Sequence, residues 1–213
     1  MAVRIIGISG YARSGKDLAR VSLEARGYSR VALADQIRNS LFLLNPLVSD
    51  SKRLVEAVNE YGWDKAKTAF PEIRSLLQRQ GTEVGRESWD ENFWIDLAFR
   101  NVPENSRIVV PDVRYPNEAE FIRSRGGQIW RVNRTGLESK NAHQSENALD
   151  DYDFDHILLN DSTPEAIDSR VAEILTLDPS FNGSYDRGED SSKSDENKGI
   201  PSQGTISEEE GDL

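Results

Sequence analysis

The sequence predicts an α/β fold in three layers, with a mostly parallel sheet covered by helices on both faces. Short apolar runs alternate along the chain with longer segments of helical apolar spacing, as expected when helical crossovers connect parallel strands. The first run, residues 3–8, is almost continuously apolar, which is typical of a strand buried on both faces. Ligands of such folds bind outside the carboxyl ends of the strands.

The first hundred residues supply two strands and a large helical region. Glycine, proline and changes of apolar period mark the boundaries. The expected elements are a strand at 3–8, a helix at 16–26, a strand at 29–33, a helix at 36–44 that Asp35 caps, helices across 51–80 with breaks near Gly62 and Pro71, and a helix at 89–100.

The remaining elements return to regular alternation, and Pro164 suits the first turn of the last helix. A polar excursion interrupts this part and is the candidate lid. The expected elements are strands at 106–111, 128–133 and 155–159, helices at 117–125 and 164–177, and the excursion at 134–152.

Charge is distributed unevenly over the 213 residues. Residues 178–213 contain ten acidic and three basic residues, and removing their net charge of −7 from the total of −11 leaves −4 for residues 1–177. The C-terminal segment has too few apolar residues to offset its ordering entropy. We therefore predict a folded domain at 1–177 and an acidic disordered tail at 178–213. A basic face for a nucleic acid polymer is not expected.

The chain contains no cysteine, which excludes disulfides and thiolate metal sites. No stretch approaches the roughly 18 consecutive apolar residues of a membrane span, and the apolar start is too short for a signal peptide. These features predict a cytoplasmic protein without a membrane partner. A homodimer is the default expectation for a soluble oligomer.

A phosphate-binding loop follows the first strand. Its spacing is G-x-x-x-x-G-K, with glycines where the backbone must wrap around phosphate oxygens and a lysine for the β- and γ-phosphates. The following helix directs its positive end at the same phosphates. The motif predicts ATP or GTP binding, and a P-loop kinase is the favoured class. The loop residues are Gly10, Tyr11, Ala12, Arg13, Ser14, Gly15, Lys16 and Asp17.

Asp17 departs from the usual loop, which has a serine or threonine hydroxyl that reaches Mg²⁺. A carboxylate at this position could bind the metal directly, hold a metal-bound water, or cap the helix. Leu18 offers no substitute hydroxyl. Asp17 is therefore the first candidate metal ligand.

Three stretches resemble the phage-type deoxynucleoside monophosphate kinases, and the resemblance extends over residues 1 to about 177. Residues 9–17 resemble the family's S-G-x-x-R-S-G-K-D loop, residues 77–86 its L-Q-x-x-G-T-E-x-x-R segment, and residues 109–119 its V-V-x-D-V-R-x-x-N-E-A segment. Animal-type phosphomevalonate kinases share a similar G-K-D loop. The second and third stretches favour the nucleotide enzymes.

The resemblance implies a three-layer P-loop kinase fold that transfers a phosphoryl group from ATP, with Mg²⁺, to a deoxynucleoside monophosphate. It also implies a helical acceptor-binding region at about 35–100 and a lid at about 134–152. If the chain is phage-encoded, its location is the host cytoplasm. The alternatives are a phosphomevalonate-type or other small-metabolite kinase, and a nucleotide-binding module that has lost turnover.

Arginines are the candidate acceptor ligands, because a planar guanidinium binds phosphate through two hydrogen bonds. Arg38 is either a phosphate contact or a surface charge. Arg86 contacts phosphate or base, or forms a salt bridge with Glu83 or Glu87. Arg114 binds acceptor phosphate or pairs with an aspartate two residues earlier. Asp35 and Glu83 are assigned to the same acceptor site.

Four further residues complete the expected site. Asp112 closes a predicted strand, where it either holds Mg²⁺ through water or caps a turn. Arg131 and Arg134 flank the entrance of the lid and, with Lys16 and Arg13, are the candidate catalytic cations; ordinary strand-end charges are the alternative. The excursion also contains three residues that could orient the lid: His143, Ser145 and Glu146.

Overall fold

The computed structural model describes residues 4–137, 147–178 and 181. Residues 1–183 form one compact unit, and all described residues belong to it. The central part of the predicted lid, including His143, Ser145 and Glu146, and nearly all of the predicted tail lie outside the described residues.

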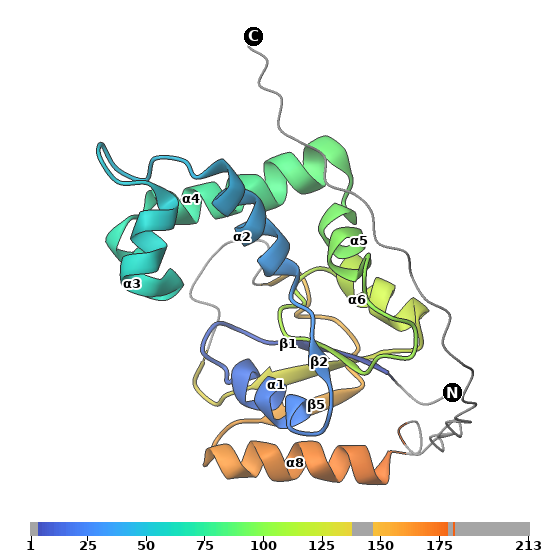
Figure 1. Cartoon of the computed structure of the whole chain (residues 1–213). Coiled ribbons are helices and arrows are strands. Elements are labelled where there is room, and N and C mark those ends of the chain that lie inside the picture. Colours follow the sequence, from blue (N-terminus) through green and yellow to red (C-terminus); the bar gives the residue numbers. More distant parts are fainter. Residues whose placement is uncertain (1–3, 138–146, 179–180, 182–213) are drawn as a thin grey trace, which may run out of the picture. The chain divides into compact units, whose positions relative to one another are not determined.

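A parallel sheet forms the centre of this unit (Figure 1), in the strand order β2-β3-β1-β4-β5. Every strand pairing is parallel, which confirms the predicted sheet. The strands are β1 (Ile5–Ser9), β2 (Ser29–Arg30), β3 (Ile108–Val110), β4 (Gln128–Asn133) and β5 (His156–Leu159).

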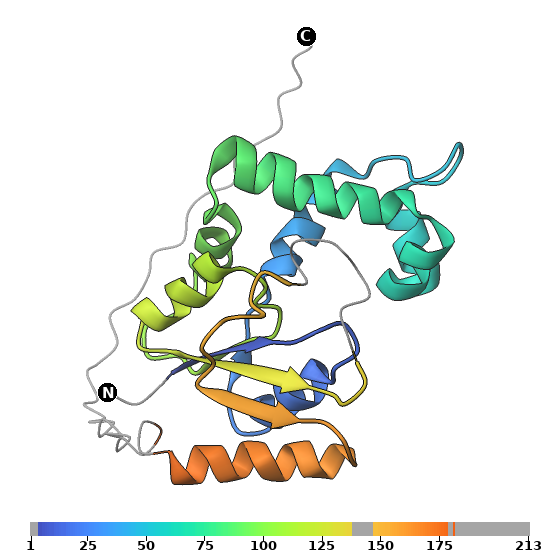
Figure 2. The ribbon, with the colours of Figure 1, turned by 180° about the vertical axis from the view of Figure 1, so that it is seen from behind.

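Helices α1 (Lys16–Glu24) and α8 (Pro164–Leu177) cover one face of the sheet, and α5 (Phe93–Phe99) and α6 (Pro116–Ser124) cover the other. Figure 2 shows α8 below the sheet and α6 above it. Alternating side chains explain this arrangement. In β1, Ile6 and Ile8 join the core beneath α1, whereas Ile5 joins the core beneath α6. The three predicted layers are therefore confirmed.

A helical region with its own apolar core extends beyond the sheet. Both predicted breaks are present. Gly62 is non-helical at φ 71°, and Pro71 precedes the start of α4. The elements of this region are α2 (Leu33–Leu44), α3 (Leu54–Ala69), α4 (Glu72–Arg79) and the π-helix η1 (Gln80–Trp89).

Three local predictions for residues 29–36 are wrong. The second strand ends at Arg30, and α2 begins at Leu33 instead of residue 36. Asp35 therefore lies inside the first turn of α2 and does not cap it. The π-helix η1 was also not predicted. Nothing in the local apolar spacing distinguishes this segment from an α-helix.

Candidate active site

The phosphate loop connects the carboxyl end of β1 to the start of α1. Gly10 (φ 141°) and Gly15 (φ 101°) adopt backbone conformations that L side chains rarely take. A Cβ at Gly10 would lie 2.4 Å from the Val132 carbonyl oxygen, and a Cβ at Gly15 would lie 2.2 Å from Nδ2 of Asn160. Neighbouring elements therefore require both glycines of the motif.

Lys16 lies over this loop. Its Nζ donates hydrogen bonds to the carbonyl oxygens of Gly10 (2.5 Å) and Tyr11 (2.7 Å). The ammonium group is thus held at the edge of the loop, beside the N-terminus of α1. A positive charge and a positive helix end at one place suit the β- and γ-phosphates of a nucleotide.

Ser14 and Asn160 form the floor of the loop. The Ser14 side chain is buried, and its Oγ has no hydrogen-bond partner among the residues that the structure describes. Asn160, after β5, donates from Nδ2 to the Ser14 carbonyl oxygen at 2.8 Å. A buried hydroxyl without a partner is unusual in folded proteins, so Ser14 fits a ligand with acceptor oxygens at this loop. The sequence alone indicated no role for Asn160.

Asp17 is largely exposed, with 89% of its side-chain surface accessible. Its Oδ1 accepts a hydrogen bond from Arg20 at 3.2 Å. The N-cap position of α1 belongs to Gly15, so Asp17 does not cap the helix. An exposed carboxylate in the first turn of α1 fits the metal alternative.

Arg131 lies beneath the phosphate loop and is only 7% exposed. Its guanidinium is 4.7 Å from the centre of the Tyr11 ring and donates to Asp150 Oδ1 at 3.0 Å. Tyr11 donates its hydroxyl to the same Asp150 oxygen at 2.7 Å, and this hydrogen bond raises the pKa of Tyr11. Arg131 therefore supports the loop and contacts Asp150 in the described C-terminal part of the predicted lid.

Arg13 and Arg134 are exposed near the same edge of the sheet. Arg13 has a positive φ of 67°, and no hydrogen bond or ion pair links its side chain to another described residue. Arg134 follows β4 and opens the turn 134–137.

A large cavity of about 710 Å³ lies between the helical region and the β3–α6 turn. A smaller hollow beside the phosphate loop shares Ala12 and Arg114 with it. The large cavity therefore borders the phosphate loop. Its charged lining is mainly positive and consists of Arg38, Lys67, Arg74, Arg86 and Arg114, with Asp112 and Glu118.

Asp112 connects the end of β3 to the start of α2. Its carboxylate accepts hydrogen bonds from the backbone N–H groups of Leu33 (3.1 Å) and Ala34 (2.8 Å). Burial raises the pKa of Asp112, and the two N–H groups oppose that shift. Asp112 therefore caps the start of α2, and not a turn as its capping alternative proposed. Each carboxylate oxygen retains acceptor capacity for a metal-bound water.

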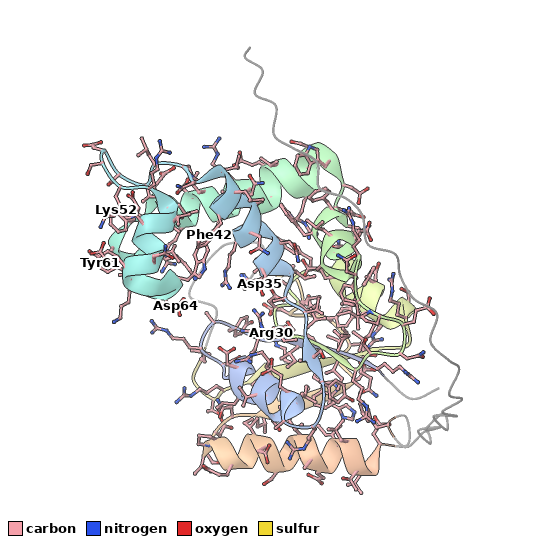
Figure 3. The ribbon with its side chains drawn as sticks, in the orientation of Figure 1. Arg30, Asp35, Phe42, Lys52, Tyr61 and Asp64 are labelled. Atoms are coloured by element: carbon pink, nitrogen blue, oxygen red, sulfur yellow. The ribbon has the colours of Figure 1, made fainter. Side chains whose placement is uncertain are left out.

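Arg38 lies one turn into α2 and lines the large cavity. It donates to Asp35 at 3.2 Å and lies 5.4 Å from the Trp63 ring centre. Asp35 also pairs with Arg30, and Figure 3 shows Arg30 directly below Asp35 at the base of α2. Burial alone would raise the pKa of Asp35, but Arg30 and Arg38 hold it below its ordinary value. Asp35 therefore orients Arg38 and is not itself among the cavity-lining residues.

The π-helix η1 places Arg86 against the β3–α6 turn. Arg86 pairs with Glu118 of α6, and not with Glu83 or Glu87 as its salt-bridge alternative proposed. Glu83 is exposed and its carboxylate lies 3.5 Å from Nε of Arg79. Trp94 is buried and donates from Nε1 to the Gly81 carbonyl oxygen at 2.9 Å, which holds η1 in place.

Several lining residues had no distinguishing sequence signal. In the sequence, Lys67 and Arg74 resemble ordinary charges on a helix surface. Only the fold turns their side of α3 and α4 toward the large cavity. Glu118 lies in the family-like stretch 109–119, but its spacing in the sequence did not indicate its partners.

Among the described residues, no group of three or more acidic, histidine or cysteine side chains forms a metal cluster. No described helix is long and apolar enough to cross a bilayer.

Comparison with known families gives one match over most of the fold. Residues 57–171 match the model of the deoxynucleotide monophosphate kinase family, which is more than half of the chain. The chain belongs to this family. The match includes most of the large-cavity lining and continues through β5 into α8.

Individual viral relatives agree with this assignment. A protein of Acanthamoeba polyphaga mimivirus, provisionally named a deoxynucleotide monophosphate kinase, is 28% identical over 184 residues, which are 78% of this chain and 93% of the relative. The deoxynucleotide monophosphate kinases of Escherichia phage RB69 and Enterobacteria phage T4 are 32% and 27% identical. Those alignments span 48% and 49% of this chain, and 44% and 46% of the two phage proteins.

Proposed function

We propose that this kinase transfers the γ-phosphoryl group of ATP directly to the phosphate of a deoxynucleoside monophosphate, giving ADP and a deoxynucleoside diphosphate. The observation that carries the proposal is that the hollow beside the phosphate loop adjoins the large cavity. Ala12 and Arg114 line both the hollow beside the phosphate loop and the large, mainly cationic cavity. A donor phosphate and an acceptor phosphate can therefore meet at this junction.

The phosphate loop is the proposed donor site. Backbone N–H groups of the loop surround the β- and γ-phosphates, apart from that of Ser14, which donates to the Tyr11 carbonyl oxygen. Ser14 Oγ donates to one of the phosphate oxygens. Lys16 moves from the Gly10 and Tyr11 carbonyl oxygens to the phosphates, where charge develops during transfer. Arg13, Arg131 and Arg134 are proposed to supply further positive charge, Arg131 chiefly by supporting the loop through Tyr11.

The large cavity is the proposed acceptor site. Arg86 and Arg114 contact the acceptor phosphate, Arg38 contributes a third cation, and Asp35 orients Arg38. An oxygen of the acceptor phosphate attacks the γ-phosphorus while the bond to the β–γ bridging oxygen breaks. A phosphate oxygen carries no proton that must be removed, so the chain needs to supply position and charge and no general base. Glu83, which is exposed, stays a candidate contact from the sequence.

Asp17 and Asp112 are the proposed residues for Mg²⁺. When bound, Mg²⁺ neutralises charge across the β- and γ-phosphate oxygens. Asp17 has the exposure that a ligand needs, and Asp112 fits a hydrogen bond to metal-bound water. Two carboxylates combined with substrate phosphates are a common protein share of a Mg²⁺ site.

The test is ADP production from ATP and Mg²⁺ with a panel of acceptors: dAMP, dCMP, dGMP, dTMP, the ribonucleotides and phosphomevalonate. We expect at least one deoxynucleoside monophosphate to stimulate ADP release. Release with phosphomevalonate alone would identify a small-metabolite kinase. Tight ATP binding without release for any acceptor would identify a non-catalytic module.

A further inference from the structure

Glu118 is a buried carboxylate that the proposed chemistry does not use. It lies in the first turn of α6 and is 7% exposed. One oxygen, Oε2, accepts hydrogen bonds from the backbone N–H groups of Arg114 (2.7 Å) and Tyr115 (3.1 Å). Burying a carboxylate is costly unless all its oxygens are paired, so the position of the second oxygen is informative.

The second oxygen, Oε1, pairs with Arg86 of η1. Nη1 of Arg86 lies 3.1 Å from it, and Nη2 of Arg86 donates to Asn117 Oδ1 at 2.6 Å. The guanidinium also lies 3.9 Å from the centre of the Tyr115 ring. Two hydrogen bonds and a ring face fix the plane of the guanidinium. Among the described residues these contacts use two of its five N–H groups.

The groups joined by Glu118 belong to two walls of the large cavity. Arg86 is 32 residues before Glu118 in the chain, whereas Arg114 and Tyr115 form the turn before α6. All four residues line the large cavity. A carboxylate that only capped α6 would need Oε2 alone, and would not require an arginine from another element.

We propose that Glu118 is a positioning residue for the acceptor phosphate, because it fixes the guanidinium of Arg86 and the turn that carries Arg114 in one arrangement. This inference rests on the proposed function. Asn117 and Tyr115 assist by restricting the same guanidinium. The acceptor then meets two cations that are already oriented, and loses less free energy in ordering them on binding.

The titration of Glu118 gives a way to observe this role. Burial raises the pKa of Glu118 to about 7, although the N–H groups of Arg114 and Tyr115 and the charge of Arg86 favour the ionised form. Asp112 also faces this region and raises the pKa further. Protonation below pH 7 removes the charge that holds Arg86. The KM for the acceptor should therefore rise as pH falls from 8 to 6.

The experiment compares wild type, Glu118→Gln, Arg86→Lys, the double variant, and Glu120→Gln as a matched control. Glu120 is an exposed carboxylate on the same helix. The KM for deoxynucleoside monophosphate, the KM for ATP and kcat are measured between pH 6 and 8, and thermal unfolding checks the fold. The acceptor phosphate itself titrates near pH 6. This contribution to the acceptor KM is the same for every variant and cancels when variants are compared at one pH.

We expect Glu118→Gln to raise the acceptor KM about 10-fold at pH 8, as for the loss of a hydrogen bond to a charged group. The ATP KM should change less than about 2-fold, and the variant should lack the wild-type rise in acceptor KM below pH 7. The double variant should be little worse than Arg86→Lys, because both changes disturb one interaction. Glu120→Gln should match wild type.

Three results would overturn the inference. The first is an unchanged acceptor KM in folded Glu118→Gln, and the second is an equal rise of the acceptor KM and the ATP KM. The third is a double variant whose rise in acceptor KM is the product of the rises in Glu118→Gln and Arg86→Lys. If Glu118→Gln does not fold, the acceptor KM of wild type between pH 6 and 8, together with that of Arg86→Lys, tests the role of Glu118. An acceptor KM independent of pH after correction for the acceptor would then refute the role. Wild type without acceptor-dependent ADP release would instead refute the proposed function itself.

Discussion

The proposed donor and acceptor sites of this kinase are built in different ways. The phosphate loop is one continuous segment of eight residues, in which the close approach of Val132 and Asn160 requires glycine at positions 10 and 15. The large cavity instead combines side chains from α2, α3, α4, η1, α5 and the β3–α6 turn. A continuous backbone site should fail when a single local group is removed. An assembled site should fail when a contact between elements is removed, which the following changes test in order of expected size.

Lys16→Ala should cause the largest loss. Because its charge meets charge that develops on the phosphates, kcat/KM should fall by at least about 30-fold, or ~2 kcal/mol of transition-state stabilisation. Steady-state kinetics with the acceptor identified by the panel measure this. Lys65→Ala, which removes an exposed lysine of α3, is the control. Near-wild-type turnover in Lys16→Ala would refute the donor role.

Arg114→Gln should damage the acceptor side selectively. Loss of a charge-assisted hydrogen bond predicts an acceptor KM raised by about 10- to 100-fold, with the ATP KM nearly unchanged. Arg100→Gln, at an exposed arginine after α5, is the matched control. If Arg114→Gln raised both KM values together, the division between a donor loop and an acceptor cavity would be wrong.

Asn160→Ala should have a smaller effect than Arg114→Gln, and should change the ATP KM instead of the acceptor KM. The change removes the hydrogen bond to the buried Ser14 carbonyl oxygen, at a cost of about 1–3 kcal/mol in the free energy of unfolding. The ATP KM should rise several-fold and the acceptor KM should stay constant. Denaturant unfolding and both KM values are compared with Asn101→Ala, at an exposed asparagine. A wild-type ATP KM would show that the loop keeps its shape without this anchor.

Asp168→Asn should have the smallest effect and should spare both sites. Asp168 of α8 pairs with Arg26 and accepts from Ser22, and these contacts lower its pKa to about 2. The folded-state pKa lies below the unfolded value of 3.8, so the stabilisation is present above pH 4 and is lost as pH falls toward 2. Thermal unfolding of wild type should therefore approach that of Asp168→Asn at low pH. Equal pH dependence of the two proteins would contradict the pair.

Much of the framework could be read from the chain because its signals are local. β-branched runs and helical spacing located the five strands and most helices, and Gly62 and Pro71 marked real breaks. The start of α2 was misplaced because its cap comes from Asp112, which is 78 residues later than Ala34. The π-helix was missed because its apolar spacing does not distinguish it from an α-helix, and its contacts through Trp94 and Glu118 are to other elements.

The sequence by itself determined the class of fold and the donor loop, because a parallel α/β pattern and G-x-x-x-x-G-K each depend on neighbours in the chain. Only the tertiary structure decided how the large cavity, the proposed acceptor site, is arranged. It made Asp112 the cap of α2 and brought Arg86 to Glu118. The physical reason is that these interactions join residues far apart in sequence, and their partners are chosen by packing and burial, which no spacing along the chain records.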